Sequence, residues 1–389
     1  MVFDHRGRPM KSIRTLTYLA MLSCLVTGCR MDGRYRRDER FAPLDDVAAE
    51  EIDAGHVPGA VILVGQGDRL LYWEAFGDAV SEPYLVPMTK ETVFDLASLT
   101  KPIATATSIL ILADRGRLDL DDAVGKYLPA FACNGKEEAR IRHLLAHTSG
   151  LPAYTSAAAL EREHGRPCPD KVIAKICGLA AMSPPGEKFR YSCLGYITLA
   201  QIVRVVSGQA IDAFSRENIY EPLGMMRTSF NPPASWQADI AGTTIVDGQP
   251  LRGTVHDPLA QLMDGLGGNA GLFSSAADLA LYCRMLLNGG TLNGRRILSP
   301  EAVELLISPQ SHGRAFGFDV SSGYAWVKGP HTSKRAFCHT GYTGTSIVCD
   351  PASDAYLILL INRVHPDDKG RSKPIREKTA EIVFGVLAP

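Results

Sequence analysis

The spacing of apolar residues changes along the chain, and each change predicts a new element. Residues 44–54 carry apolar side chains at helical spacing, with acidic residues early, and Pro58 interrupts the pattern. Two runs rich in β-branched and aromatic residues follow at 60–64 and 70–75, and the Gly-Gln-Gly-Asp sequence between them favours a tight turn. The pattern therefore predicts a helix followed by a β-hairpin.

Helical patterns separated by Pro- and Gly-rich loops occupy the middle of the chain. The apolar run 102–113 predicts a buried helix, and residues 276–287 predict another one, which an Asn-Gly-Gly sequence ends. Strand-like runs and a last helix are predicted toward the C-terminus, at 324–327, 345–349, 355–361 and 375–386.

Strands at both chain ends with helices between them predict an α+β fold. In this fold a single antiparallel sheet is built from the two chain ends and flanked by helices, and a mainly helical region is inserted between them. We expect one domain over residues 44–389, with an α/β part at about 44–102 and 264–389 and a helical part at about 103–263.

Composition and charge narrow the class of protein. The 389 residues are 46% hydrophobic and 21% charged, which is typical of a globular protein with a substantial core. A formal net charge of -1 lacks the basic field that a phosphate backbone requires, so we expect no nucleic-acid partner. The one dense cationic stretch, "RYRRDER" at 34–40, also contains acidic residues and falls in a predicted linker, 29–43.

The first residues are typical of an export signal. Lys11 and Arg14 precede an apolar stretch at 16–26, which is shorter than the roughly 20 residues of a membrane span. The stretch ends in "LVTGC", which resembles the lipobox of bacterial lipoproteins. We therefore predict a signal peptide at 1–28 and a lipid on Cys29 that anchors an exported protein in the envelope, facing the periplasm, with the outer membrane preferred; Met10 is an alternative start.

The remaining cysteines do not form a recognisable framework. Seven of the nine cysteines follow Cys29, without the density or the C-x-x-C pairs of a disulfide scaffold or zinc site. At most one or two disulfides are expected, and no metal or organic cofactor.

A serine and a lysine three residues apart stand in "DLASLTKP", directly before the predicted helix at 102–113. On a helical turn this spacing places both side chains on one face. A serine hydroxyl needs a base within hydrogen-bond reach to act as a nucleophile, and burial can lower the pKa of a lysine so that it accepts a proton. We predict that Ser98 is the nucleophile and Lys101 its base.

Two further motifs follow in an order that supports this interpretation. "PGEKFRYSCLGY" contains Tyr191, and "FCHTGYTGT" contains His339, Thr340 and Gly341 on a strand-like run. Together with "LLAHTSGLP" at 144–152, "PLGMMRTSF" and "GGNAGLFSSAADLA", these motifs span about residues 46–388. The chain resembles the superfamily of serine β-lactamases and penicillin-binding proteins, in the branch of class C β-lactamases, D-alanyl-D-alanine peptidases and family VIII carboxylesterases.

The resemblance implies roles for further residues. Tyr191 would carry the proton between Ser98 and the leaving group, and the main-chain N–H groups of Ser98 and Tyr342 would bind the developing oxyanion. Losing one such donor costs roughly 10²- to 10³-fold in rate. The positions of Cys193, His339, Thr340 and Gly341 would contact the substrate.

Two of these positions depart from the family pattern. Cys193 stands where the family usually has asparagine, and a thiol is a much weaker donor and acceptor than an amide. His339 stands where many β-lactamases and peptidases have lysine, and an imidazole with a reference pKa of about 6.5 is mostly neutral at pH 7. Both changes argue against an efficient β-lactamase.

Other catalytic classes fit less well. His143 and His147 could both face a metal, but no glutamate in an H-E-x-x-H arrangement and no third ligand accompany them, so we interpret them as packing and loop-bonding residues. The "GLGGNA" sequence at 265–270 follows no apolar strand, which favours a glycine loop near the active site over a dinucleotide site. No G-x-S-x-G elbow is present.

The sequence thus predicts a monomeric serine hydrolase that forms an acyl-enzyme with an ester or amide, as a carboxylesterase or a D-alanyl peptidase does. The substrate would be a small molecule or a fragment derived from peptidoglycan. A β-lactamase is the alternative within the class. An alternative of another class, motivated by Cys193, is a non-catalytic envelope protein that binds a peptidoglycan-like ligand.

Overall fold

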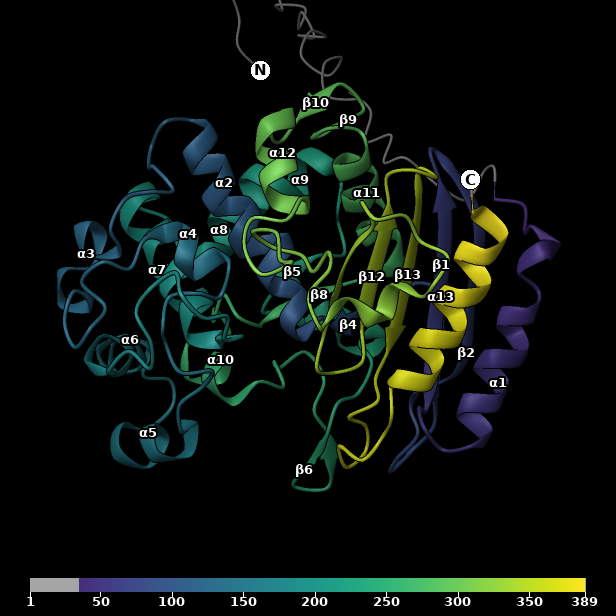
Figure 1. Ribbon diagram of the computed structural model, residues 1–389. Helices are drawn as coiled ribbons and strands as arrows, with labels where there is room; N and C mark the ends of the chain where they lie inside the picture. Colours follow the sequence, from purple (N-terminus) through teal and green to yellow (C-terminus); the bar gives the residue numbers. More distant parts are fainter. Residues whose placement is uncertain (1–34, 389) are drawn as a thin grey trace, which may run out of the picture. The chain divides into compact units, whose positions relative to one another are not determined.

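A six-stranded antiparallel sheet forms the centre of the computed structural model, which describes residues 35–388 (Figure 1). Its strand order is β11-β12-β13-β1-β2-β3. β1 (Gly59–Gln66) pairs with β13 (Ala355–Ile361), so strands from the two ends of the chain lie side by side. The predicted α+β fold with a sheet built from both chain ends is confirmed.

Most of the other strands are short and lie outside this sheet. β4, β8 and β5 form a three-stranded sheet, and β6-β7 and β9-β10 are two-residue hairpins. The remaining strands are β2 (Arg69–Val80), β3 (Val86–Pro87), β4 (Phe94–Asp95), β5 (Ser229–Phe230), β6 (Ile245–Val246), β7 (Gln249–Pro250), β8 (Leu272–Ser274), β9 (Thr291–Leu292), β10 (Arg295–Arg296), β11 (Phe337–Thr340) and β12 (Ser346–Asp350).

Helices at the two chain ends flank the sheet, and most of the others form the region between β4 and β8. The α-helices are α1 (Pro43–Asp53), α2 (Thr107–Asp114), α3 (Val124–Tyr127), α4 (Ile141–Leu145), α5 (Ala157–His164), α6 (Pro169–Gly178), α7 (Cys193–Ser207), α8 (Ile211–Ser215), α9 (Glu221–Leu223), α10 (Pro258–Leu262), α11 (Ala276–Leu287), α12 (Pro300–Ile307) and α13 (Lys373–Leu387).

Shorter helical turns connect these elements. The 3-10 turns are η2 (Glu39–Phe41), η3 (Ala97–Leu99), η5 (Pro129–Phe131), η7 (Ala234–Asp239) and η8 (Ala325–Lys328), and the π-helical segments are η4 (Lys101–Ala106) and η6 (Arg216–Tyr220). Within residues 35–388, no single helix is long and apolar enough to cross a membrane; α7 and the helical segment 211–223 pass that test of length and composition only as a pair bent by 76°.

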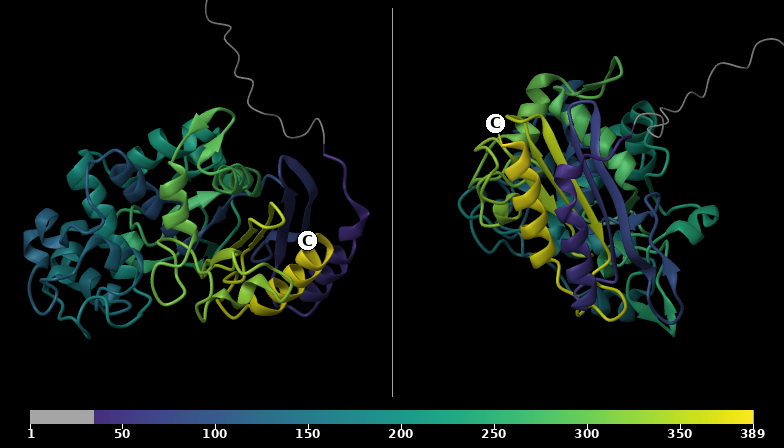
Figure 2. Two further views of the ribbon diagram at one scale, coloured as in Figure 1. Left: turned by 45° about the horizontal axis from the view of Figure 1, so that its top comes forward. Right: turned by 90° about the vertical axis from the view of Figure 1, so that its right-hand side faces the viewer.

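The sheet is covered on both faces, which explains its continuous apolar strands. α1 and α13 pack against each other and against one face, as the right-hand view of Figure 2 shows, while α11 packs against β1 and β13. Every residue of β13 is buried. A strand with both faces covered has a continuous run of apolar residues instead of alternating apolar and polar residues. The sequence of β13, "AYLILLI", is such a run.

Two expectations differ from the structure. Residues 324–327 were expected to form a strand, but 325–327 belong to the 3-10 turn η8, because Asp319 already exchanges both main-chain hydrogen bonds with Cys338 at the outer edge of β11. Residues 35–43 were expected to belong to a linker. Instead, the Tyr35 hydroxyl donates to Glu74 and accepts from the N–H of Trp73, which ties this stretch to β2.

The predicted signal peptide, the lipid anchor at Cys29 and the first residues of the predicted linker lie outside the described residues. The seven cysteines within the described part of the chain are free thiols.

Candidate active site

The predicted nucleophile follows β4 at the point where the chain turns from the small sheet into the helical region. Ser98 lies in η3 and is partly exposed, whereas Lys101 opens η4 and is fully buried. The Lys101 Nζ donates to Ser98 Oγ over 3.0 Å and to the main-chain oxygen of Asn269 over 2.9 Å. The structure therefore places the predicted serine and lysine in direct contact. The glycine loop at 265–270 lies at the site, as the sequence indicated.

The charge state of Lys101 differs from the expectation. Burial lowers the pKa of Lys101, but the neighbouring Cys193 and Tyr191 raise it, so the pKa lies above the usual lysine value. The sequence suggested that burial could lower this pKa, but the neighbouring groups make the net direction upward. In this structure Lys101 Nζ donates to Ser98 Oγ, in keeping with the raised pKa.

Tyr191 lies against both Lys101 and a histidine from the "LLAHTSGLP" segment. Its ring centroid is 5.0 Å from Lys101 Nζ, and the His147 ring stacks on it at 4.4 Å and 25°. His147 Nδ1 accepts from the N–H of Ser192, the residue after Tyr191, over 3.0 Å. The interpretation of His147 as a packing and loop-bonding residue agrees with these contacts, which also show that it sets the orientation of Tyr191.

His339 belongs to β11 and faces the same group of side chains. Its ring centroid is 6.3 Å from that of Tyr191, and its Nδ1 donates to the Thr340 oxygen over 3.0 Å. Burial and the positive charges of Arg314 and Lys101 hold the pKa of His339 well below the usual histidine value. His339 is therefore neutral near pH 7, and its Nε2 has no hydrogen-bond partner among residues 35–388.

The end of β11 lies close to the nucleophile turn. A side chain at Gly341 would have its Cβ 2.5 Å from the main-chain oxygen of Leu96, so only glycine permits this approach. The next residue, Tyr342, exposes its ring, and its main-chain N–H makes no hydrogen bond within the described part of the chain. A free N–H at this place suits the predicted oxyanion donor.

Cys193 is the first residue of α7, and its N–H donates to the Ala153 oxygen over 2.9 Å. It is partly exposed and close enough to Lys101 to influence its charge. The structure thus brings together all predicted site residues from Ser98 to Tyr342, while Cys29 lies outside the described residues.

Arg314 is a charged residue near the site that sequence patterns did not reveal. Its side chain is fully buried, donates through Nη1 to Asp319, and lies with Cζ 5.5 Å from the Tyr191 ring centroid. It follows a His-Gly pair in an irregular loop, without any motif that could have indicated a role. Only the packing of this loop against Tyr191 and His339 identifies it.

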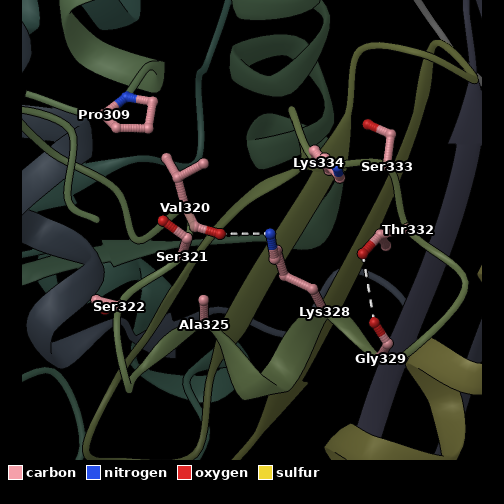
Figure 3. A pocket seen from close by; sticks show the side chains of 10 residues that line it. All are labelled: Pro309, Val320, Ser321, Ser322, Ala325, Lys328, Gly329, Thr332, Ser333 and Lys334. Atoms are coloured by element: carbon pink, nitrogen blue, oxygen red, sulfur yellow. Dashed lines mark hydrogen bonds between the residues drawn. The ribbon is translucent and has the colours of Figure 1, made fainter.

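A separate pocket of about 570 Å³ lies near η8, and neither Ser98 nor Lys101 lines it (Figure 3). Lys328 points into this pocket with its Nζ donating to the oxygens of Val320 and Ala336. No group of three or more potential metal ligands occurs between residues 35 and 388.

The site combines a partly exposed serine in contact with a buried lysine, a neighbouring tyrosine and an unpaired main-chain N–H. These are the groups that a serine hydrolase needs to form an acyl-enzyme. The family model described as Beta-lactamase matches residues 44–380. The chain belongs to the beta-lactamase family, and it is a serine hydrolase of that family.

Relatives in this family carry names of different hydrolases. An N-acetylmuramyl-L-alanine amidase of Bacillus subtilis (strain 168) is 32% identical, over 84% of this chain and 82% of the relative. A protein of Escherichia coli (strain K12) with the provisional name D-alanyl-D-alanine carboxypeptidase is 30% identical, over 90% of this chain and 91% of the relative.

Solved structures agree with the fold. A family VIII carboxylesterase superposes with a TM-score of 0.70 at 21% identity, over 90% of this chain and 99% of the other chain. At this level of identity, the similarity establishes the β-lactamase-like fold and leaves the substrate open.

Proposed function

We propose that this protein hydrolyses carboxylic esters through an acyl-enzyme on Ser98, in the manner of a carboxylesterase. The observation that carries the proposal is the 3.0 Å contact between Ser98 Oγ and the fully buried Lys101 Nζ, beside Tyr191. Burying an amine has a high desolvation cost, so this contact is unfavourable for stability alone. An amine next to a serine hydroxyl can, however, activate that serine as a nucleophile.

The reaction would proceed in two steps. Ser98 Oγ attacks the carbonyl carbon while Lys101 holds it by a hydrogen bond. Tyr191 accepts the proton of Ser98 and passes its own hydroxyl proton to the oxygen of the leaving alcohol, whose bond to the carbonyl carbon then breaks. Water then attacks the acyl group, and Ser98 is released with its proton.

Two side chains favour an ester over an amide or a β-lactam. Cys193 replaces the amide side chain that would grip a substrate amide, and a thiol donates and accepts weakly. His339 is neutral and buried, so it offers no charge to a substrate carboxylate. A β-lactamase activity is therefore the weaker alternative.

A D-alanyl peptidase or amidase acting on a fragment derived from peptidoglycan is the second candidate. It is favoured by the names of the two relatives at 30% and 32% identity, both of which refer to components of peptidoglycan. This candidate fits the proposed export of the chain and its proposed lipid anchor at Cys29. We further propose a monomer that acts in the periplasm, with the outer membrane as the preferred site of anchoring.

Mass spectrometry of the intact soluble chain from residue 31 tests the proposal. Wild type and Ser98→Ala are exposed briefly to a short-chain aryl ester, to a penicillin and to a peptide ending in D-alanyl-D-alanine. We expect an acyl adduct from the ester in wild type alone, together with turnover of that ester.

Each other outcome has a distinct meaning. An adduct from the penicillin or cleavage of the peptide, without ester turnover, would favour the second candidate or the β-lactamase. If a folded wild-type protein forms no adduct and turns over none of the three reagents, the protein is a non-catalytic envelope protein that binds a peptidoglycan-like ligand. An adduct that persists in Ser98→Ala would place the nucleophile elsewhere.

A further inference from the structure

Asp95 is a buried carboxylate three residues before Ser98, and both of its oxygens accept main-chain hydrogen bonds. Asp95 is the last residue of β4, and it is 3% exposed. Oδ1 accepts from the N–H of Ala97 over 2.8 Å, and Oδ2 accepts from the N–H of His256 over 2.7 Å. A single side chain thus bonds the nucleophile turn to a loop about 160 residues away in the sequence.

The bond to Ala97 supports an unfavourable main-chain conformation. Ala97 has φ of 45°, in the left-handed region that is unfavourable for a residue with a Cβ. An aspartate that accepts from the N–H two residues later stabilises such a turn. Because Ser98 follows directly, the conformation of Ala97 determines where the Ser98 N–H and Oγ point.

The main chain of the same segment is bonded to the loop after β11. The main-chain oxygen of Asp95 accepts from Thr343 Oγ1 over 2.7 Å, and the main-chain oxygen of Leu96 accepts from Thr345 Oγ1 over 3.1 Å. On the other side, the ring of His256 stacks on the ring of Tyr342 at 5.8 Å and 19°. Asp95 therefore contacts segments on both sides of Tyr342.

We propose that Asp95 is a positioning residue that sets the N–H groups of Ser98 and Tyr342 at the separation needed to bind one oxyanion. The inference rests on the proposed function, since it assigns Asp95 to the oxyanion site of that same reaction. Such donors act only when they lie about 2.7–3.1 Å from the developing charge, and a displacement of about 1 Å can cost 10²-fold in rate.

The variant Asp95→Asn tests this role with the full soluble chain. Asparagine keeps one acceptor but turns an NH₂ group toward the other main-chain N–H, which pushes one of the two bonded segments away. We expect kcat for an aryl ester to fall about 10²-fold while KM changes less than about threefold, because oxyanion binding develops only in the transition state.

The affinity for an arylboronic acid distinguishes a positioning role of Asp95 from a general structural role, which would leave this affinity unchanged. Boronic acids form a tetrahedral adduct on an active serine and imitate the transition state, so their affinity should fall by the same factor as kcat/KM. The measurement is the inhibition constant of the boronic acid, compared with KM for the ester.

Asp278→Asn is a matched control. Asp278 is also a buried carboxylate that accepts a main-chain N–H, that of Arg227, over 2.7 Å, but it lies in α11 and bonds to the segment before β5 instead of the nucleophile turn. We expect this control to keep both kcat and boronate affinity. If Asp95→Asn does not fold, Thr343→Val takes its place, because it removes the hydroxyl that donates to the Asp95 oxygen.

The inference would be overturned by a kcat within about threefold of wild type in a folded Asp95→Asn, or by boronate affinity that stays constant while kcat falls. Full activity in Thr343→Val when Asp95→Asn is unfolded would also overturn it. Failure of the proposed function looks different, because the wild-type protein itself would then turn over no ester and bind no boronate.

Discussion

Among the individual residues around Tyr191, two histidines are neutral and two basic residues lie close to the ring. The Lys101 Nζ and the Arg314 Cζ lie 5.0 and 5.5 Å from the Tyr191 ring centroid. Burial and these cations hold the pKa of both His147 and His339 well below the usual value. Lys101 and Arg314 therefore provide the positive potential here, and His339 contributes no charge near pH 7.

The neutral state of His339 predicts a flat pH response. Affinity for a carboxylate-bearing substrate would rise with falling pH only if His339 gained a proton between pH 8 and 5. Because its pKa lies well below the usual value, it stays neutral over this range and the affinity should stay constant. Inhibition constants of a carboxylate-bearing substrate analogue at several pH values check this.

The corresponding methyl ester is the control for pH effects elsewhere in the site. An affinity that rises for the carboxylate alone, approaching tenfold per pH unit, would show that His339 titrates and binds the anion.

At the scale of elements, β13 and the nucleophile segment differ in what determines their conformation. β13 is central in the sheet, with β12 on one side and β1 on the other, and all its side chains are buried. The nucleophile segment is the opposite case, since a 3-10 turn and a π-helical turn follow each other from Ala97 to Ala106 before α2 begins. π-helical turns frequently mark functional sites, and here tertiary contacts hold this one.

Truncation of β13 should destabilise the fold without changing the chemistry. Leu359 is fully buried, and it pairs with Ile62 of β1 on one side and with Ser346 of β12 on the other. Leu359→Ala therefore removes apolar contacts and leaves a cavity. We expect a loss of about 2–5 kcal/mol in the free energy of unfolding. Urea unfolding measures it, and ester turnover per folded molecule should remain that of wild type.

Val205→Ala is the control, because Val205 is 48% exposed on α7 and should cost much less. Equal losses in the two variants would contradict the assignment of β13 to the core.

At the scale of the whole molecule, buried titratable groups link stability to pH. The pKa values of His143, His147, His339 and His365 are lowered by burial. The unfolded chain takes up protons at these histidines near pH 6.5 while the folded protein does not. This contribution to stability is present above pH 6.5 and is lost as pH falls.

Two buried carboxylates act in the opposite direction. Burial raises the pKa of Asp278 to about 6 and that of Asp95 above its usual value, so the folded protein takes up protons there before the unfolded chain does. Four histidines against two carboxylates leave a net loss of stability on acidification.

We therefore expect the free energy of unfolding to fall by about 1–3 kcal/mol between pH 6.5 and 5. Urea unfolding at several pH values measures it, and His339→Gln should reduce the slope by up to one proton. A stability that increases over this range would contradict the burial of neutral histidines.

Much of the fold could be predicted because its causes are local. The predicted bounds of α11 and β13 agree with the structure, since periodic apolar residues with an Asn-Gly-Gly end or a dense β-rich run specify type and length together. The segment 324–327 was predicted wrongly because its composition suits a strand, while Asp319 occupies the edge of β11 that it would need.

The sequence by itself identified the reacting residues of the candidate site but not the neighbouring Arg314. Ser98 and Lys101 lie one turn apart, and Tyr191 and His339 belong to motifs that are legible in order along the chain. Only the tertiary structure decided how they are held and charged. The contacts of Lys101 with Asn269 and of Asp95 with His256 and Thr343 join segments more than 150 residues apart. Burial and neighbouring charges, which set the pKa values of Lys101 and His339, exist only once those segments have packed together.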